Sequence, residues 1–411
     1  MKILIVTARY YPENFSITNI AEFFAANGHD TTVLTGIPNY GENKVYDNFD
    51  GNLCGNHKGV KIIRIKEHIR KKGLISLILN YFSFYRKMPA KLKKLSANKY
   101  DIVLSYGISP IITMRGIKKF CNKQNIKHIH YGVDIWPESF LATNFIKKKN
   151  FLFRLLKKYS AKLYSSCDLI TFASPCVEKY MSNFLGVNRP FKHIYQPTLT
   201  DKPDLNLVKG HEYCANGKIN ILYCGSIARF HRLDLFLKAL SKCHNKDKFN
   251  LHIVGSGSEL ENIKKTANEL KMRNVFFYGR VSSLETINFY LKSDVLYVPL
   301  FINSFTSNMI PQKLIEYLMY NRPIFGMIGG DGKDILKNAS NSNIISGQTI
   351  SELTKNLDAL SNKNVDELKR CGDENRLYFD NNSRFTLKTI CSELIECMEN
   401  INDYENISNR F

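Results

Sequence analysis

Residues 307–330 read SNMIPQKLIEYLMYNRPIFGMIGG, a helix pattern that runs directly into a strand pattern. Pro311 suits the first turn of a helix, and Leu314 and Leu318 lie on one apolar stripe. Pro323 stops this helix ahead of the apolar run PIFGMI, which has the length of a buried strand. A helix that leads into a buried strand is the repeating unit of α/β domains.

Lys313 and Glu316 lie three residues apart on this helix, on a different face from Leu314 and Leu318. A lysine in the first turn opposes the helix dipole, which makes sense if an anion such as a diphosphate lies beyond that end. A carboxylate one turn deeper can accept hydrogen bonds from the hydroxyls of a ribose. The alternative is a solvated ion pair, worth roughly a few tenths of a kcal/mol.

Apolar runs of strand length recur between helical and loop segments, which predicts doubly wound parallel α/β sheets. The first series is KILIVT (2–7), DTTVLT (30–35), VKIIRI (60–65), YDIVLS (100–105), KHIHYG (127–132), DLITFA (168–173) and FKHIY (191–195). The pattern restarts with INILYCG (219–225), FNLHIVG (249–255), NVFFYG (274–279), DVLYVP (294–299) and PIFGMI (323–328).

A chain of 411 residues is too long to fold around a single hydrophobic core, so two domains are expected. We place them at 1–197 and 198–382, because residues 196–218 lack periodicity, carry turn formers and have the character of a linker. An amphipathic segment follows at 383–411. Its pattern allows docking on either domain, and we expect the N-terminal one.

The net charge of +21 is concentrated in the N-terminal half, where residues 1–195 hold 31 Lys and Arg against 12 Asp and Glu. Such a half is expected to meet a phospholipid surface, a pyrophosphate-bearing acceptor or nucleic acid. Residues 61–100 and 139–166 combine cations with apolar side chains, as helices at a membrane interface do. The alternative is that both apolar faces pack on the sheet. We expect an anionic membrane surface and no nucleic acid, since no aromatic-interleaved basic motif is present.

Ten cysteines are scattered singly, without metal-ligand spacing, so neither a zinc site nor a disulfide framework is expected. The longest apolar stretch, Leu74 to Tyr85, is too short to span a bilayer, and no secretory signal is visible. Together with the basic half, these features predict a cytoplasmic protein that is peripheral on the inner face of the cell membrane.

Two loops that follow strands carry residues suited to phosphate. Gly255 and Gly257 follow FNLHIV and could offer backbone N–H groups, although a tight turn has the same pattern. Gly225 turns the chain after INILYC. The loop then carries Ser226, Arg229, His231 and Arg232. Arginines here suit a phosphate, but arginines are also common on protein surfaces.

The chain resembles the retaining glycosyltransferases of family 4, which have the GT-B fold, in the order and spacing of LYCGSI, HIVGSGSELENI, NVFFYGRVSSLETINFYLKSDVLYVPL and IPQKLIEYLMYNRPIF. YYPENFSITNIAEFFAANGHDTTVLTGIPNY and VDIWPES are similar to the branch that builds bacterial surface polysaccharides. The resemblance implies two Rossmann-like domains that face each other across a cleft, the first binding the acceptor and the second the donor.

The resemblance also implies roles for individual residues. Glu316 matches the second glutamate of the family's E-x7-E motif, which binds the donor ribose, and Asn308 stands at the position of the first. Arg280 and Val281 match the GRV turn beside the nucleotide base. The full donor set is Gly225, Ser226, Arg229, His231, Arg232, Gly255, Arg280, Val281, Asn308, Met309, Ile310, Lys313 and Glu316.

The chain departs from the family pattern at the phosphates. Ser226 and His231 stand where the family has Arg and Lys, which leaves Arg229, Arg232 or Lys313 to neutralise the diphosphate.

On the acceptor side, Asp134 matches the aspartate of a frequent His–Asp pair, with Val133 in place of the histidine. The resemblance makes Asp134 and Glu316 the catalytic residues, with Asp134 orienting the acceptor hydroxyl or receiving its proton. The alternative for Asp134 is a helix or turn cap. The acceptor set is Asn14, Ser16, Asp134 and Glu138.

The resemblance implies transfer of a sugar, with retention, from a nucleotide-diphosphate donor, most simply a UDP-sugar, to a lipid-linked or growing glycan of a capsule or O-antigen. It also implies that neither a metal nor a cofactor is bound and that the leaving diphosphate itself helps to deprotonate the acceptor. One alternative of the same fold is a soluble synthase of the glycogen or sucrose type. The others are an inactive scaffold and a protein that binds polyanions or nucleic acid.

Overall fold

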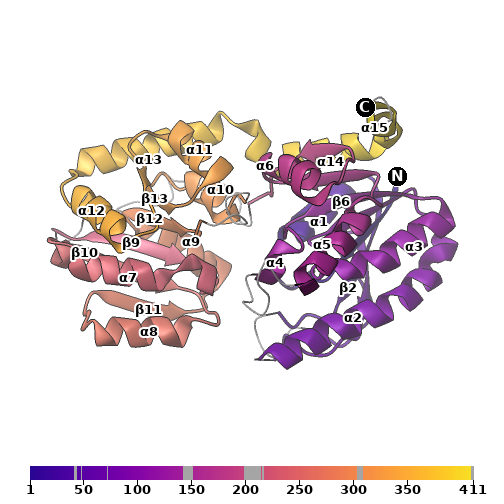
Figure 1. Ribbon diagram of the computed structural model, residues 1–411, viewed down its shortest axis with the longest axis horizontal. Helices are drawn as coiled ribbons and strands as arrows, with labels where there is room; N and C mark the ends of the chain where they lie inside the picture. The colour runs from indigo at the N-terminus through magenta and orange to yellow at the C-terminus, as the bar shows by residue number, and fades with distance from the viewer. Residues whose placement is uncertain are drawn as a thin grey trace. The chain divides into compact units, whose positions relative to one another are not determined.

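The computed structural model describes residues 1–40, 44–47, 49–71, 73–141, 151–198, 214, 217–302 and 309–408. The chain divides into two compact units (Figure 1). Unit 1 consists of Met1–Leu199 and Thr386–Phe411, and unit 2 is Thr200–Phe385. Most of the expected linker, residues 196–218, lies outside the described residues.

Unit 1 is built around an eight-stranded sheet in the order β3-β4-β2-β1-β5-β6-β7-β8. Its strands are β1 (Lys2–Thr7), β2 (Asp30–Gly36), β3 (Cys54–His57), β4 (Val60–Ile65), β5 (Ile102–Tyr106), β6 (Lys127–Gly132), β7 (Leu169–Phe172) and β8 (Phe191–His193). Its helices are α1 (Ser16–Ala26), α2 (Leu74–Leu95), α3 (Met114–Gln124), α4 (Glu138–Leu141), α5 (Phe151–Tyr164), α6 (Cys176–Lys179), α14 (Leu387–Glu399) and α15 (Ile401–Ser408).

Two helix layers cover this sheet. Ile3 and Ile5 of β1 face α1 and α14, whose apolar side chains belong to the same buried cluster. The alternate residues Leu4 and Val6 are also fully buried and face the other side, because side chains alternate along a strand. On that side α3 contacts both α2 and α5, so the three helices form one layer (Figure 1).

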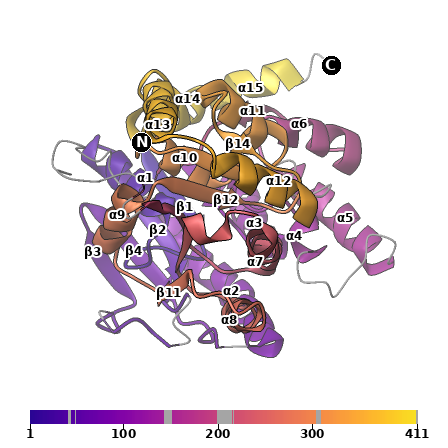
Figure 2. The same ribbon diagram turned by 90° about the vertical axis from the view of Figure 1, so that its left-hand side faces the viewer.

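Unit 2 has a six-stranded parallel sheet in the order β11-β10-β9-β12-β13-β14. Its strands are β9 (Ile219–Cys224), β10 (Phe249–Val254), β11 (Val275–Gly279), β12 (Val295–Pro299), β13 (Ile324–Met327) and β14 (Ile344–Ile345). Its helices are α7 (Leu233–Lys242), α8 (Leu260–Glu269), α9 (Ser283–Lys292), α10 (Gln312–Leu318), α11 (Gly330–Ala339), α12 (Ile350–Leu360) and α13 (Val365–Asp380). Figure 2 shows α7 and α12 on one side of the sheet and α9 and α10 on the other.

Each predicted run forms a strand, and the differences from the expected pattern lie at the edges. β3 pairs antiparallel with β4, and its CGNH sequence gave no signal because Cys54, Gly55 and Asn56 are exposed. Backbone pairing with β4 holds this edge strand together with His57, whose ring stacks on Tyr11 and lies 3.1 Å from Glu22. Helix α10 begins at Gln312, with Pro311 as its N-cap residue.

None of the helices in the described ranges has the length and apolar character needed to cross a membrane.

Candidate functional site

The loops after β9, β10 and β11 meet at one edge of the sheet in unit 2. The Gly225 N–H donates to Val254 O at 2.8 Å, and the Gly255 N–H donates to Gly279 O at 2.6 Å. Gly255 has φ +131°, and a Cβ there would lie 1.9 Å from Gly225 O. Only glycine allows these two loops to pack backbone against backbone.

Lys313 reaches across this edge from α10. A Cβ on Gly225 would lie 2.4 Å from Lys313 Nζ, so the ammonium group lies directly against the glycine turn. Lys313 Nζ donates to Tyr223 Oη at 3.2 Å and lies 4.4 Å from the centre of the Tyr223 ring. Burial lowers the pKa of Lys313 to about 8, and the nearby Cys224 and Glu316 partly oppose that shift. The position suits a cation that binds an anion at the turn.

Tyr223 links this lysine to the loop after β9. Its hydroxyl donates to Ser226 O and lies 2.9 Å from His231 Nδ1. His231 is buried, and burial together with Lys313 lowers its pKa well below the usual range. The imidazole is therefore neutral at physiological pH. It can orient Tyr223 and Ser226, but it adds no positive charge for a phosphate.

Glu316 lies one turn beyond Lys313 and is buried. Its charge raises the pKa of the neighbouring Tyr290 and Tyr317 hydroxyls, alongside the larger effect of burial. No salt bridge joins Lys313 to a carboxylate within the described residues. The structure does not show Lys313 and Glu316 as a solvated ion pair, since Glu316 is buried and the half-buried Lys313 donates to Tyr223.

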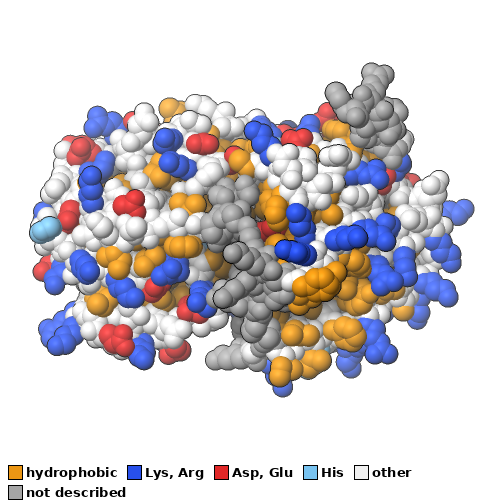
Figure 3. Space-filling view, in the orientation of Figure 1, with side chains coloured by type: hydrophobic (Ala, Val, Ile, Leu, Met, Phe, Trp, Pro, Cys, Tyr) orange, Lys and Arg blue, Asp and Glu red, His pale blue; other side chains and the backbone are white. Residues whose placement is uncertain are grey.

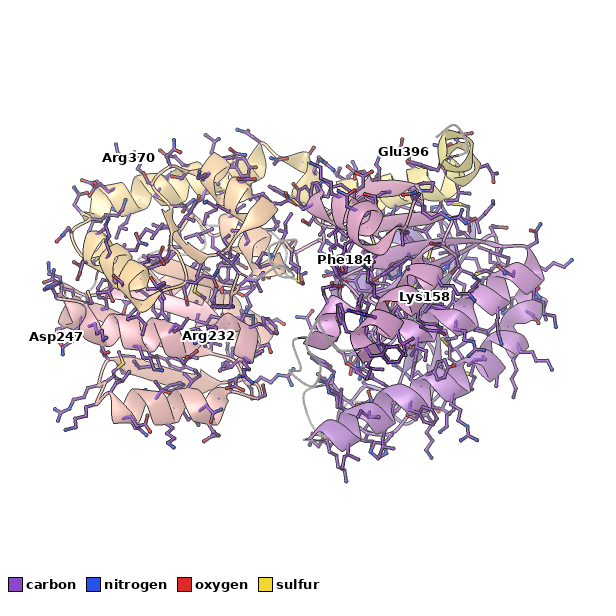
Figure 4. The ribbon with its side chains drawn as sticks, viewed as in Figure 1. Lys158, Phe184, Arg232, Asp247, Arg370 and Glu396 are labelled. Atoms are coloured by element: carbon purple, nitrogen blue, oxygen red, sulfur yellow. The ribbon has the colours of Figure 1, made fainter. Side chains whose placement is uncertain are left out.

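Arg229 and Arg232 line a cavity of about 500 Å³ between the loop after β9 and α8, together with Glu259. Arg232, labelled in Figure 4, is the N-cap residue of α7. It donates from both Nε and Nη2 to Asp234, at 2.9 and 3.0 Å. Arg229 is exposed. Of the three cations proposed for the diphosphate, Arg229 and Arg232 line this cavity, whereas Lys313 is not among its lining residues.

The remaining donor candidates flank this edge. Arg280 is exposed and Val281 half-buried directly after β11, whose Gly279 accepts the hydrogen bond from Gly255. Met309 and Ile310 are half-buried and lead into α10. Asn308, the position of the family's first glutamate, lies outside the described residues.

In unit 1, Asp134 follows β6. Burial raises the pKa of its carboxyl, and a hydrogen bond with Ser109 partly offsets that rise. Ser109 Oγ also accepts from Trp136 Nε1 at 3.2 Å, and the Trp136 N–H donates to Tyr164 Oη at 3.1 Å. The carboxylate therefore has a fixed position and a raised pKa, which suits a group that accepts a proton.

The other acceptor candidates have different surroundings. Glu138 is fully buried in α4, where it helps burial to raise the pKa of Tyr180. Ser16 is buried at the start of α1 and donates to Pro197 O at 3.2 Å, whereas Asn14 is exposed. Glu138 and Ser16 thus have internal structural partners.

Sequence reasoning missed a buried polar network behind the strand ends of unit 1. Arg9 donates to Glu67 Oε1 and Asn80 Oδ1, both at 2.9 Å. Asn39 Nδ2 donates to the same Glu67 oxygen at 2.8 Å, and Glu13 accepts the Asn39 N–H at 2.8 Å. The available signal was the position of Arg9, Asn39 and Glu67, each within three residues of the end of β1, β2 or β4. Such a network fixes the loops of this edge.

No cluster of three or more His, Cys, Asp or Glu residues in the described part of the chain could hold a metal ion.

Comparison with known families identifies the class. The model for "Glycosyltransferase Family 4" matches residues 14–201, and the model for "Glycosyl transferases group 1" matches residues 213–378. The chain therefore belongs to the family 4 glycosyltransferases.

Two relatives share low identity with the chain. The probable glycosyltransferase WbjE of Pseudomonas aeruginosa is 23% identical over 273 residues, 64% of each chain, which is just under two thirds of that relative's length. An uncharacterized glycosyltransferase of Haemophilus influenzae is 25% identical over 363 residues, 87% of this chain and 89% of its own.

Solved structures show the fold. Sucrose-phosphate synthase from Thermosynechococcus elongatus matches with a TM-score of 0.72 and 13% identity, over 98% of this chain and 100% of its own. WaaG, a glycosyltransferase involved in lipopolysaccharide biosynthesis, matches with a TM-score of 0.67 and 15% identity, over 96% of this chain and 99% of its own. Anabaena HepE in complex with UDP matches with a TM-score of 0.66 and 12% identity, over 97% of this chain and 100% of its own. The chain has the GT-B fold.

Proposed function

We propose that this glycosyltransferase moves a sugar, with retention of the anomeric configuration, from a UDP-sugar to a lipid-linked or growing glycan in bacterial surface polysaccharide synthesis. Unit 2 binds the donor and unit 1 the acceptor. The observation that carries the proposal is the Lys313 ammonium group, held against the Gly225 turn with Glu316 buried one turn beyond. The likeness to HepE, which was crystallised with UDP, and to WaaG supports the choice of donor and pathway.

In this proposal Lys313 and the backbone of the glycine turn stabilise the diphosphate as it leaves. The bond between the sugar C1 and the diphosphate oxygen breaks, and the acceptor oxygen bonds to C1 on the same face. The acceptor proton passes to the departing diphosphate. Glu316 accepts hydrogen bonds from the ribose, and Asp134 orients the acceptor hydroxyl. These steps require no metal, because the cation that neutralises the diphosphate is a side chain.

Thermal unfolding with nucleoside diphosphates, in the presence of a chelator, tests this proposal. UDP should raise the melting temperature, since a ligand that binds only the folded state stabilises it. A shift that requires Mg²⁺ or Mn²⁺ would overturn the metal-free mechanism. A rise in melting temperature with GDP or ADP but not with UDP would mean that the donor carries guanine or adenine in place of uracil. No shift with any of the three would favour the inactive scaffold, and salt-sensitive retention of oligonucleotides would favour the polyanion-binding alternative.

A further inference from the structure

Helix α2 carries an apolar stripe on its outer face as well as on its inner one. Phe84, Met88 and Leu92 are buried on the inner side. The outer stripe, at helical spacing in the first half of α2, consists of Ile75, Ile78, Leu79 and Phe82, all of which are exposed. Ile75 has 76% of its surface in contact with solvent. This stripe is not part of the core, so packing on the sheet explains only one face of the helix.

Helix α5 repeats this arrangement. Leu163 and Phe153 are buried, whereas Phe151, Leu152 and Leu155 are exposed, with Phe151 at 71%. Since α3 contacts both helices, the outer stripes of α2 and α5 belong to one layer of unit 1. Figure 3 shows hydrophobic side chains gathered over this part of unit 1, with Lys and Arg around them.

Cations surround the apolar side chains. Helices α2, α3 and α5 contain no Asp or Glu. Arg86, Lys93, Arg154 and Lys158 are exposed, and none of them takes part in an ion pair between described residues. Lys157 Nζ instead lies 3.8 Å from the centre of the Phe184 ring. Lys158, the next residue of α5, is labelled in Figure 4.

We propose that this apolar–cationic face, defined by the outer sides of α2 and α5, docks on the surface of an anionic lipid bilayer. The apolar side chains enter the boundary between headgroups and acyl chains, and the cations pair with the lipid phosphates, as in interfacial helices. A second copy of the chain is a poor occupant, because it would bring cations against cations. Nucleic acid offers no apolar surface for Ile75 or Phe151. The proposal goes beyond sugar transfer, since binding to lipid does not depend on the donor site.

Flotation with vesicles of phosphatidylcholine, with or without phosphatidylglycerol, tests the face. The wild type should float only with phosphatidylglycerol at low salt, and should be released as salt rises. The charge variant replaces Arg86, Lys93, Arg154 and Lys158 by Gln. Its control replaces Lys242, Lys246, Lys337 and Lys355, which are exposed in unit 2, by Gln. The charge variant should lose on the order of ten-fold or more in partitioning, and the control should match the wild type.

The apolar side chains need a separate pair of variants. Ile75→Ser with Phe151→Ser should also lose on the order of ten-fold in partitioning, whereas Leu284→Ser with Leu377→Ser, which removes similarly exposed side chains from unit 2, should not. All these sites are exposed, and a thermal melt checks that each variant folds. UDP should bind every variant as it binds the wild type, which separates a failure of this face from a failure of the donor site.

Insertion has its own readout. Trp136 is the single tryptophan and is buried, so Phe82→Trp adds one reporter on the outer stripe. Its emission should shift to the blue when anionic vesicles are added. The proposal would be overturned if the emission did not shift, if the face and control variants floated equally, or if the wild type did not bind anionic vesicles. It would also be overturned if the protein dimerised through this face or bound oligonucleotides and did not float.

Discussion

Lys313 Nζ lies 3.2 Å from Tyr223 Oη, and the same hydroxyl lies 2.9 Å from His231 Nδ1. A lysine from α10 and a histidine from the loop after β9 thus share one phenol. The histidine is neutral, so Lys313 supplies the positive charge at this turn. By the resemblance to family 4, His231 stands where the family has a lysine, and in the proposed function Lys313 provides the cation instead.

Lys313→Ala should weaken UDP binding by roughly ten- to a hundred-fold, because a hydrogen bond to a charged group contributes about 1.5–3 kcal/mol. Titration calorimetry measures this effect. Lys337→Ala is the matched control, since Lys337 is exposed on α11 and lies in the same unit. Equal affinities for the two variants would remove Lys313 from the donor site.

The affinity for UDP should depend on pH through Lys313. Burial holds its pKa at about 8 in the free protein, and a bound diphosphate would raise that pKa by stabilising the ammonium form. Binding therefore takes up a proton once the pH exceeds the free-state value. Between about pH 7, where the diphosphate is fully ionised, and about pH 8 the affinity should change little, and above about pH 8 it should fall by up to ten-fold per pH unit. Lys313→Arg should flatten this fall, since arginine stays charged.

Glu316→Gln should lower turnover by roughly 10², because it removes the charge from a hydrogen-bonding partner of the donor while keeping the shape of the side chain. Steady-state kinetics and the melting temperature are measured together. The expected result is lost activity with a folded protein. Wild-type turnover and unchanged UDP affinity would show that the buried carboxylate does not contact the donor.

Asp134→Asn should affect turnover, whereas Glu138→Gln should affect the stability of the fold. Asp134→Asn should lower turnover by roughly 10² or more and leave UDP binding unchanged, since its proposed role concerns the acceptor. Glu138 is fully buried, so Glu138→Gln should act chiefly on stability. If Glu138→Gln were the slower enzyme at wild-type stability, the two roles would have to be exchanged.

Gly255→Ala should destabilise the protein more than Gly28→Ala. Both glycines have positive φ, +131° and +83°, so both substitutions strain the backbone by about 1 kcal/mol. At Gly28 no atom lies within 4 Å of the added Cβ, whereas at Gly255 it would lie 1.9 Å from Gly225 O. We expect Gly255→Ala to cost more than about 3 kcal/mol, measured by urea unfolding. Similar values for both variants would mean that the two loops separate easily.

The fold was predictable because buried parallel strands are apolar along their length, as KILIVT and INILYC are. The edge strand β3 was not, since three of its four residues are exposed and its sequence therefore carries no apolar pattern. At the site, helical spacing placed Lys313 and Glu316 on one face but could not show that Glu316 is buried and Lys313 half-buried. The partner of Lys313 is Tyr223, ninety positions away in sequence, and no local pattern reports such a contact.

Helix α14 contributes Ile390, Leu394 and Met398 to the core cluster that also contains Ile17 and Phe24 of α1. Unit 1 is therefore assembled from two stretches of chain, whereas unit 2 comes from one. During synthesis on a ribosome, unit 2 can complete its core as soon as its own stretch has emerged. Unit 1 must wait, with one side of its sheet uncovered, until α14 has been made. A shortened gene that stops before α14 would yield a first unit that lacks part of its interior.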